Sequence, residues 1–170
     1  MRGLVIFLVV IVTALVIREV IAYKNEYKIG YVEVNSLYDS FAFKKELEAK
    51  LVTIKQTRKN ILDSMQLQLR VLAGSLKSPN DKDRMLFEAR KEEYFSKEKT
   101  FSEDNDALTQ EYSSQVMKQL NQYVQDYGSE HGYTYILGAD GNGSLMFADK
   151  SKNVTKEILE YLNQKYKGVK

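Results

Sequence analysis

The central part of the sequence is a long stretch in which apolar residues recur at steps of three, four or seven. From about residue 39 the series is Leu47, Leu51, Ile54, Ile61, Met65, Leu69, Leu72 and Leu76. This spacing places apolar side chains on one face of an α-helix, close to the heptad seam of a coiled coil. The chain contains a single proline, Pro79, and few glycines, so little interrupts a helix. The stretch predicts one long amphipathic helix ending near residue 76.

A second helical stretch begins directly after this proline. Pro79, Asn80 and Asp81 have the composition of a turn followed by a helix start. Beyond them, aromatic and aliphatic residues recur mostly every seven or every three to four positions, and these are Phe87, Tyr94, Phe101, Leu108, Tyr112, Val116, Leu120, Tyr123 and Tyr127. Gly128 is a plausible stop signal. The pattern predicts a helix from about residue 81 to residue 127.

Two helices joined by a short turn near residues 76–82 predict an antiparallel helical hairpin over residues 39–128. At 1.5 Å per residue each arm would reach roughly 60 Å, which is more than a compact domain needs. Residues 39–78 contain eight Lys/Arg and four Asp/Glu, a net charge of +4, whereas residues 79–128 contain seven and eleven, a net charge of −4. Opposite net charges favour pairing of the two arms, although each exposed ion pair contributes little.

The segments on either side of the hairpin have the composition of strands. Residues 28–34 are rich in β-branched and aromatic residues and predict a strand, after which Asn35 or Ser36 can cap a helix. Residues 133–137 and 144–148 return to a period of two and predict two more strands. The whole is therefore an α+β fold with a small β-strand body and a long hairpin inserted between strands 1 and 2.

The last segment, residues 153–166, has an amphipathic helical pattern. Its apolar residues are Val154, Ile158, Leu159, Tyr161 and Leu162. Asn153 or Ser151 can cap its first turn, because a side-chain oxygen there accepts an otherwise unpaired backbone N–H. We therefore expect a short helix packed on the β-body.

The N-terminus begins with an apolar run, 3-GLVIFLVVIVTALVI-17, preceded by Arg2. A run of this length matches the core of a signal peptide and is short for a membrane span of about 20 residues. Small residues at Val20 and Ala22 allow cleavage before Tyr23. Residues 1–22 are therefore predicted to be a signal peptide or an N-terminal membrane anchor, and either one places the rest of the chain outside the cytoplasm.

A glycine-rich segment, 139-ADGNG-143, joins the two predicted late strands and invites comparison with ligand-binding loops. Asp140, Asn142 and Ser144 have the first spacings of a calcium loop, but Leu145 and Ser151 stand where that loop needs glycine and glutamate. The glycines do not form a dinucleotide fingerprint either, since a strand rather than a helix follows. A strand-to-strand turn that uses Gly and Asn at positive φ accounts for the segment.

No residue cluster in the sequence predicts catalysis. The chain has no cysteine, which removes disulfides, thiolate metal sites and a cysteine nucleophile. The single histidine, His131, stands at a predicted helix end and is expected to be a cap or a surface residue. Carboxylate pairs such as Glu92 and Glu93 lie within highly charged helices and are expected to be solvated. No enzyme activity, cofactor or metal is predicted, and the net charge of +2 gives no reason to expect nucleic-acid binding.

The hairpin contains more apolar residues than one seam between two helices can use. These residues hold the arms together, face a partner or do both, and we treat part of them as a candidate binding surface. Its proposed members are Leu62, Met65, Leu67, Val71, Met85, Phe87, Tyr94, Phe95 and Phe101. The methionines among them are adaptable side chains that suit poorly specified apolar contacts.

Both ends of the chain together resemble the Skp family, also called OmpH-like periplasmic chaperones. The resemblance rests on 28-KIGYVEVNSLYDSF-41 and on 132-GYTYILGADGNGSLMFADKSKNVTKEILEYLNQK-165. In the second block Asn153, Val154 and Thr155 open the last helix, where family members usually have an acid, an aliphatic residue and threonine. Asn153 should still cap the helix.

The resemblance implies a homotrimer that holds unfolded outer-membrane β-barrel proteins in the periplasm without ATP. Strands of three chains would form a central barrel, from which three helical hairpins extend like tentacles around a cavity. Three strands with open edges also favour a closed assembly on physical grounds. The residues expected at that interface are Ile29, Tyr31, Val32, Val34, Tyr135, Ile136, Leu137, Leu145 and Phe147. This chain is nearly neutral, so a role in lipopolysaccharide binding is not transferred to it.

The expected domain organisation is a signal peptide or anchor at residues 1–22, a β-body formed by residues 23–38 and 129–170, and the hairpin at residues 39–128. The expected function is that of an ATP-independent holdase, meaning a chaperone that prevents aggregation by binding alone. Its partners would be unfolded outer-membrane proteins and two further copies of itself, with membrane association through residues 1–22 if these are retained. The alternative is an inner-membrane-anchored coiled-coil structural or adaptor protein of an envelope complex, whose hairpin would dock one folded partner.

Overall fold

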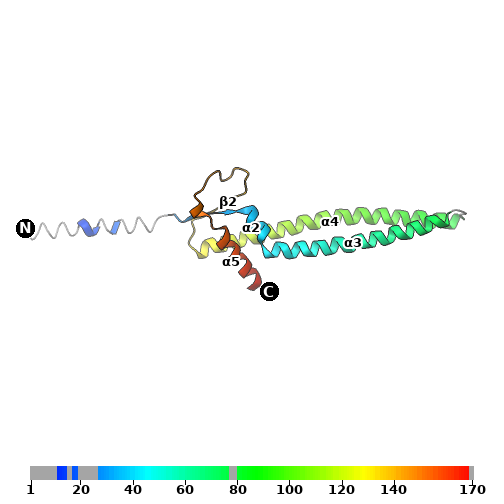
Figure 1. Ribbon diagram of the computed structural model, residues 1–170, viewed down its shortest axis with the longest axis horizontal. Helices are drawn as coiled ribbons and strands as arrows, with labels where there is room; N and C mark the ends of the chain where they lie inside the picture. Colours follow the sequence, from blue (N-terminus) through cyan, green and yellow to red (C-terminus); the bar gives the residue numbers. More distant parts are fainter. Residues whose placement is uncertain (1–10, 15–16, 19–26, 77–79, 169–170) are drawn as a thin grey trace, which may run out of the picture.

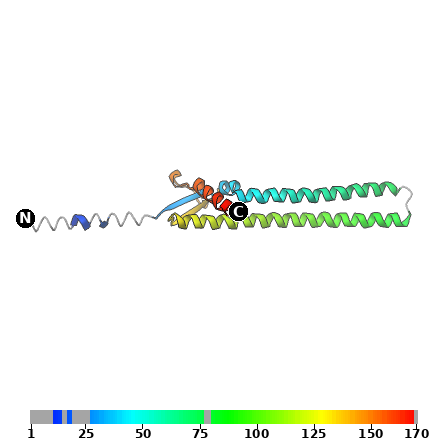
Figure 2. The ribbon, with the colours of Figure 1, turned by 90° about the horizontal axis from the view of Figure 1, so that it is seen from below.

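The structure, a computed structural model, describes residues 11–14, 17–18, 27–76 and 80–168. A small α+β body carries a long helical hairpin that extends from one side (Figures 1 and 2). The elements are β1 (Ile29–Glu33), α2 (Val34–Ser40), α3 (Ala42–Ser75), α4 (Asp81–Glu130), β2 (Tyr135–Ala139), the 3-10 turn η1 (Lys150–Lys152) and α5 (Thr155–Gly168). The hairpin lies between β1 and β2 in the chain, as the sequence predicts.

The predicted signal peptide or anchor falls mostly outside the described residues. Of residues 1–22 the structure describes residues 11–14 and 17–18, which are helical. Within the described part of the chain, no helix combines the length and the apolar character that crossing a membrane requires.

The start of the first hairpin helix differs from the prediction. A separate helix, α2, already begins at Val34, and Phe41 interrupts it with extended backbone angles (φ −68°, ψ 126°) before α3 starts at Ala42. The break turns the Phe41 ring into the core, where it meets Phe43 and Tyr123 edge-on. The expected cap by Asn35 or Ser36 is wrong, because Glu33 precedes α2 without a side-chain cap.

The second hairpin helix begins as predicted and ends later than predicted. Asn80 accepts a hydrogen bond of 2.9 Å from the N–H of Asp83 and thereby caps α4. Gly128 lies inside the helix and is buried, so the predicted stop there is wrong. The stop is Gly132, whose φ of 68° lets the N–H of Tyr133 reach the carbonyl of Gly128 at 2.8 Å. This is a Schellman motif, which a glycine in the left-handed region permits.

Within the described residues the sheet has two strands, not three. β1 and β2 pair in parallel with Ile29 opposite Tyr135 and Tyr31 opposite Leu137. Residues 144–148, predicted as a strand, lie in the loop between β2 and η1. The glycine-rich segment is therefore not a strand-to-strand turn. At the edge of β1 away from β2, the position beside Tyr31 is taken by an isolated bridge to Asn153.

The hydrophobic core lies where the base of the hairpin meets α2, β1 and α5. It consists of Val32, Leu37, Phe41, Leu47, Val116, Leu120, Tyr123, Tyr127, Val154, Ile158 and Leu162. The predicted amphipathic helix is present as α5, and Ile158 and Leu162 on its inner face are fully buried. The side chain of Asn153 accepts a hydrogen bond of 2.9 Å from the N–H of Thr155, as predicted for a cap.

Candidate functional site

The two long helices meet along one row of half-buried side chains, which we call the seam. Away from the body, α3 contributes Leu51, Ile54, Arg58, Leu62, Met65, Leu69 and Leu72, and α4 contributes Phe87, Tyr94, Phe101, Leu108 and Tyr112. Five residues proposed for partner binding therefore belong to the seam, and these are Leu62, Met65, Phe87, Tyr94 and Phe101. Their side chains hold the two helices of one hairpin together.

One seam position differs from the predicted row. The sequence pattern assigns Ile61 to the seam and Leu62 to the surplus, whereas the structure half-buries Leu62 and leaves Ile61 exposed. The steps from Ile54 to Arg58 and from Arg58 to Leu62 are both four residues. A straight helix with 3.6 residues per turn drifts against a strict seven-residue repeat, and such a doubled step compensates for the drift.

The remaining four proposed residues are exposed on the hairpin surface. The exposed fractions are 62% for Leu67, 68% for Val71, 74% for Met85 and 54% for Phe95. Together they are called the exposed arm residues below. The structure adds four exposed apolar residues that were not proposed for the binding surface, namely Val52, Ile61, Leu86 and Met117. Val52 could have been recognised because it directly follows the seam residue Leu51 and thus lies off the seam.

Most charged side chains of the two arms do not pair across the hairpin, although the opposite net charges of the arms suggested that they would. Arg58 joins the helices through a hydrogen bond to Asn105 (2.5 Å) and a salt bridge to Asp104 (3.3 Å), with Phe101 beneath its guanidinium group. The other salt bridges of the described hairpin join neighbours on one helix, such as Lys44 with Glu48. The opposite net charges of the arms therefore give few salt bridges between the two helices. The seam is held mainly by apolar packing.

One face of the small sheet is apolar and faces outward. Strand alternation places Ile29 and Tyr31 on the same face as Tyr135 and Leu137. Ile29, Tyr135 and Leu137 are exposed. We call these three residues together with Tyr31 the outer sheet face. The alternate residues point inward. Val32 lies in the core of its own chain, and Ile136 packs partly against that core.

The other residues proposed for self-association surround this sheet. Val34 is half-buried and so close to β2 that a Cβ on Gly138 would lie 2.9 Å from its Cγ2 atom. Leu145 is half-buried in the loop after β2. Phe147 and its neighbour Met146 are 86% and 88% exposed, the largest exposed fractions among the large apolar residues that the structure describes.

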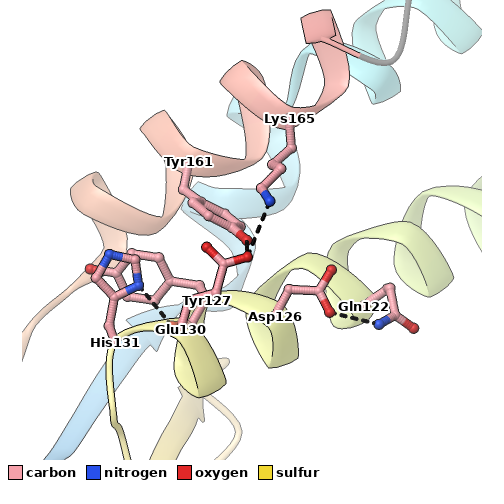
Figure 3. Close-up of polar contacts among 7 residues, drawn as sticks. All are labelled: Gln122, Asp126, Tyr127, Glu130, His131, Tyr161 and Lys165. Atoms are coloured by element: carbon pink, nitrogen blue, oxygen red, sulfur yellow. Dashed lines mark hydrogen bonds and ion pairs between the residues drawn. The ribbon is translucent and has the colours of Figure 1, made fainter.

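A polar cluster closes the body where α4 ends against α5 (Figure 3). Glu130 accepts hydrogen bonds from the Tyr161 hydroxyl (2.8 Å) and the Lys165 ammonium group (3.1 Å). These two donors hold the pKa of the Glu130 carboxyl below its ordinary value. His131 is the C-terminal cap of α4, as expected, and its ring stacks on that of Tyr127 with 4.0 Å between the ring centroids. The cluster fixes α5 to the end of α4.

The glycine-rich loop is held by its own aspartate. The Asp140 carboxylate accepts hydrogen bonds from the N–H of Asn142 (2.8 Å) and the hydroxyl of Ser144 (3.1 Å). These bonds, the first above all, lower the pKa of Asp140. Gly141 and Gly143 have positive φ as expected, whereas Asn142 does not. Among the described residues no group of three acidic, histidine or cysteine side chains is placed to hold a metal.

A two-stranded α+β body with a long helical hairpin inserted between its strands defines the class of this protein. The chain belongs to the family of OmpH-like outer membrane proteins, whose sequence model matches residues 28–162. This membership confirms the resemblance seen in the sequence.

A solved structure supports the same fold. It is a crystal structure from Caulobacter crescentus CB15 of a protein assigned as an OmpH-like outer membrane chaperone. The TM-score is 0.68 at 16% sequence identity, over 82% of this chain and 85% of that chain. No curated protein sequence is similar enough to this chain to count as a match.

Proposed function

We propose that this protein is an ATP-independent holdase that binds unfolded outer-membrane β-barrel proteins between helical hairpins. The observation that carries the proposal is the set of exposed arm residues on a hairpin whose seam is already filled by other side chains. A monomeric protein gains nothing from exposing Leu67, Val71 and Phe95 to water. Membership of the OmpH-like family supports the assignment to a chaperone.

The proposed mechanism is binding by mass action. Burial of one exposed apolar side chain by a client contributes at most about 1.5–3 kcal/mol. No single contact of this size retains an unfolded chain, but several contacts on several hairpins together do. A bound client is withdrawn from aggregation and is released when a more stable destination, such as its own folded barrel in the outer membrane, becomes accessible.

We further propose that three copies assemble through the outer sheet face and the loop that carries Phe147. A two-stranded sheet leaves backbone donors and acceptors unpaired at its edge, and an apolar outer face is costly in water. A closed barrel of strands from three chains removes both costs. Phe147 and Leu145 would then lie on a third strand that forms only in the assembly. Val32 is already buried in its own chain and supports this arrangement from inside.

The proposed location is the periplasm, reached through residues 1–22 as a signal peptide or a retained anchor. The family of outer membrane chaperones fits this compartment better than any other. A retained anchor would associate the protein with the inner membrane. The alternative function, an anchored adaptor, would need an apolar surface shaped for one folded partner, whereas the exposed arm residues are separate side chains distributed over α3 and α4.

The proposal is tested by diluting a urea-unfolded outer-membrane β-barrel protein into buffer with and without the purified protein, in the absence of nucleotide. We expect the protein to suppress turbidity at a ratio of about one assembly per client, and ATP to change nothing. Bovine serum albumin at equal mass is the control for non-specific protection. Unaltered aggregation would remove the chaperone assignment and leave the adaptor.

A further inference from the structure

The helix α3 has two unlike sides, one on each flank of the seam. Between Ile54 and Leu72 the residues that directly precede seam residues are Thr53, Thr57, Ile61, Ser64, Gln68 and Val71, and none of them is charged, whereas Lys50 precedes the seam residue Leu51 nearer the body. The residues that directly follow the seam residues from Ile54 to Leu69 are Lys55, Lys59, Asp63, Gln66 and Arg70. At the two ends of the seam, Val52 follows Leu51 and Ala73 follows Leu72. Steps of three and four residues keep each set on one strip of the helix surface. We call these strips the uncharged side and the charged side of α3.

The uncharged side is even less polar than its residue types suggest. The hydroxyl of Thr53 donates to the carbonyl of Ala49 at 3.0 Å, and that of Thr57 donates to the carbonyl of Thr53 at 3.0 Å. Both hydroxyl protons are thus already used within the helix. Ile61 and Val71 on the same side are exposed. A chain segment that covers this side therefore displaces little strongly bound water.

An apolar groove continues the uncharged side toward the body. It is lined by Glu46, Ala49, Lys50, Thr53, Ile54 and Tyr112. The two charged residues among these, Glu46 and Lys50, form a salt bridge of 3.0 Å with each other. Thr53 belongs both to the groove and to the uncharged side, so the two form one continuous surface. This surface runs from the base of the hairpin, beside Tyr112 of α4, to Val71 near its far end.

Covering the charged side with a client segment costs more desolvation free energy than covering the uncharged side. A client that lies on Lys55, Lys59 and Arg70 would remove their charges from water without supplying a partner for each. Strands of an outer-membrane barrel alternate apolar residues with polar ones, and the lipid-facing half carries few charges. The polarity of such an extended segment matches that of the uncharged side. It does not match that of the charged side.

We propose that unfolded client chains lie along the uncharged side of α3, while the charged side stays in water. This inference rests on the proposed holdase function and adds to it which strip of α3 contributes to the binding wall. Gln68 and Ser64 are then contact residues, although their residue types do not indicate it. Gln66, only two positions from Gln68, makes no client contact.

The experiment uses protein purified after expression of the full-length chain, and compares Gln68→Lys with Gln66→Lys. Both substitutions place the same charge on an exposed position of the same helix, so helix propensity and net charge are matched. Gln66 also accepts a hydrogen bond of 3.5 Å from Arg70, and its loss is checked by circular dichroism. Gln68→Glu and Gln66→Glu repeat the comparison with the opposite charge.

Affinity for an unfolded barrel protein is measured by fluorescence titration, with the client labelled. We expect both charges at position 68 to weaken binding by roughly fivefold or more, as for burial of an unpaired charge, and both at position 66 to leave binding within about twofold. Equal effects at the two positions would overturn the sidedness. An effect of one sign only, at either position, would also overturn it in favour of long-range charge attraction.

The two proposals fail in different ways in this experiment. If the unmodified protein does not bind the client, the holdase function itself is wrong. If the unmodified protein binds and the variants at positions 66 and 68 behave alike, the function stands and the assignment of the uncharged side is wrong.

Discussion

The hydroxyl of Tyr161 in α5 donates a hydrogen bond of 2.8 Å to the carboxylate of Glu130, the last residue of α4. Lys165, one helical turn further along α5, donates to the same carboxylate oxygen. The C-terminal end of α4 and the helix α5 are thereby joined at the surface of the body. This joint lies next to the apolar contacts of Ile158 and Leu162 in the core.

The first prediction concerns the pH dependence of this joint. The pKa of Glu130 is lowered in the folded protein, first by Tyr161 and then by Lys165. Its ionised form therefore stabilises the fold above the unfolded pKa of about 4.3. This contribution is lost as the pH falls through the lower folded pKa. We expect Glu130→Gln to be less stable than the unmodified protein at pH 7 and equally stable at the acidic end.

Urea midpoints measured from pH 7 down to pH 3, at one protein concentration, test this prediction. Glu92→Gln on the exposed surface of α4 is the control and should run parallel to the unmodified protein. A deficit of Glu130→Gln that stays constant over the whole pH range would show that the carboxylate charge is not what stabilises the joint.

The second prediction concerns the core beneath α5. Leu162 is fully buried, so Leu162→Ala should remove about 2–5 kcal/mol of unfolding free energy through lost burial and the cavity left behind. Leu67→Ala makes the same chemical change at an exposed helix position and should stay within about 0.5 kcal/mol. Chemical unfolding followed by circular dichroism measures both. Similar losses in the two variants would contradict the placement of α5.

The third prediction concerns self-association. Leu137 lies on the outer sheet face and is exposed in the single chain. Leu137→Lys would bury an unpaired charge in the proposed barrel, so we expect sedimentation to show dissociation to monomers with the hairpin still helical. Thr134→Lys, just before β2, should leave the assembly intact. An unchanged assembly in Leu137→Lys would place the interface elsewhere.

The fourth prediction separates client contact from hairpin packing. Phe95 is exposed, whereas Phe101 lies in the seam beside Arg58. Phe95→Ser should weaken retention of an unfolded barrel protein several-fold and leave the helical content unchanged. Phe101→Ser should instead destabilise the hairpin by about 1–3 kcal/mol, since the side chain is half-buried. Retention of client by Phe95→Ser at the unmodified level would remove this residue from the binding surface.

The hairpin was predictable from the sequence because apolar spacing over many turns is a repeated signal. A single break in such a pattern is not. Phe41 interrupts the helix, and its ring lies among Phe43, Tyr123 and Tyr166. No local pattern predicts contacts with residues as far away in the chain as Tyr123 and Tyr166. The doubled four-residue step at Arg58 is likewise visible only once the partner helix is present.

The candidate surface was predictable only as a pool of apolar residues. The sequence shows that the hairpin has more apolar residues than one seam can use, but the direction of each side chain around its helix decides which of them, such as Phe95, remain exposed. The predicted third strand is a second case in which the local sequence pattern did not determine the structure. Residues 144–148 alternate like a strand, yet a strand forms only where it pairs with a neighbouring strand, and in the described chain the sheet contains β1 and β2 alone.

The central claim is tested most directly by light scattering coupled to size exclusion, on the purified protein alone and after mixing with a urea-diluted outer-membrane β-barrel protein. We predict a trimer that takes up the barrel protein into a soluble complex of defined mass without any nucleotide. A trimer that leaves the barrel protein to precipitate would contradict the holdase function, and a monomer would contradict the assembly on which it depends.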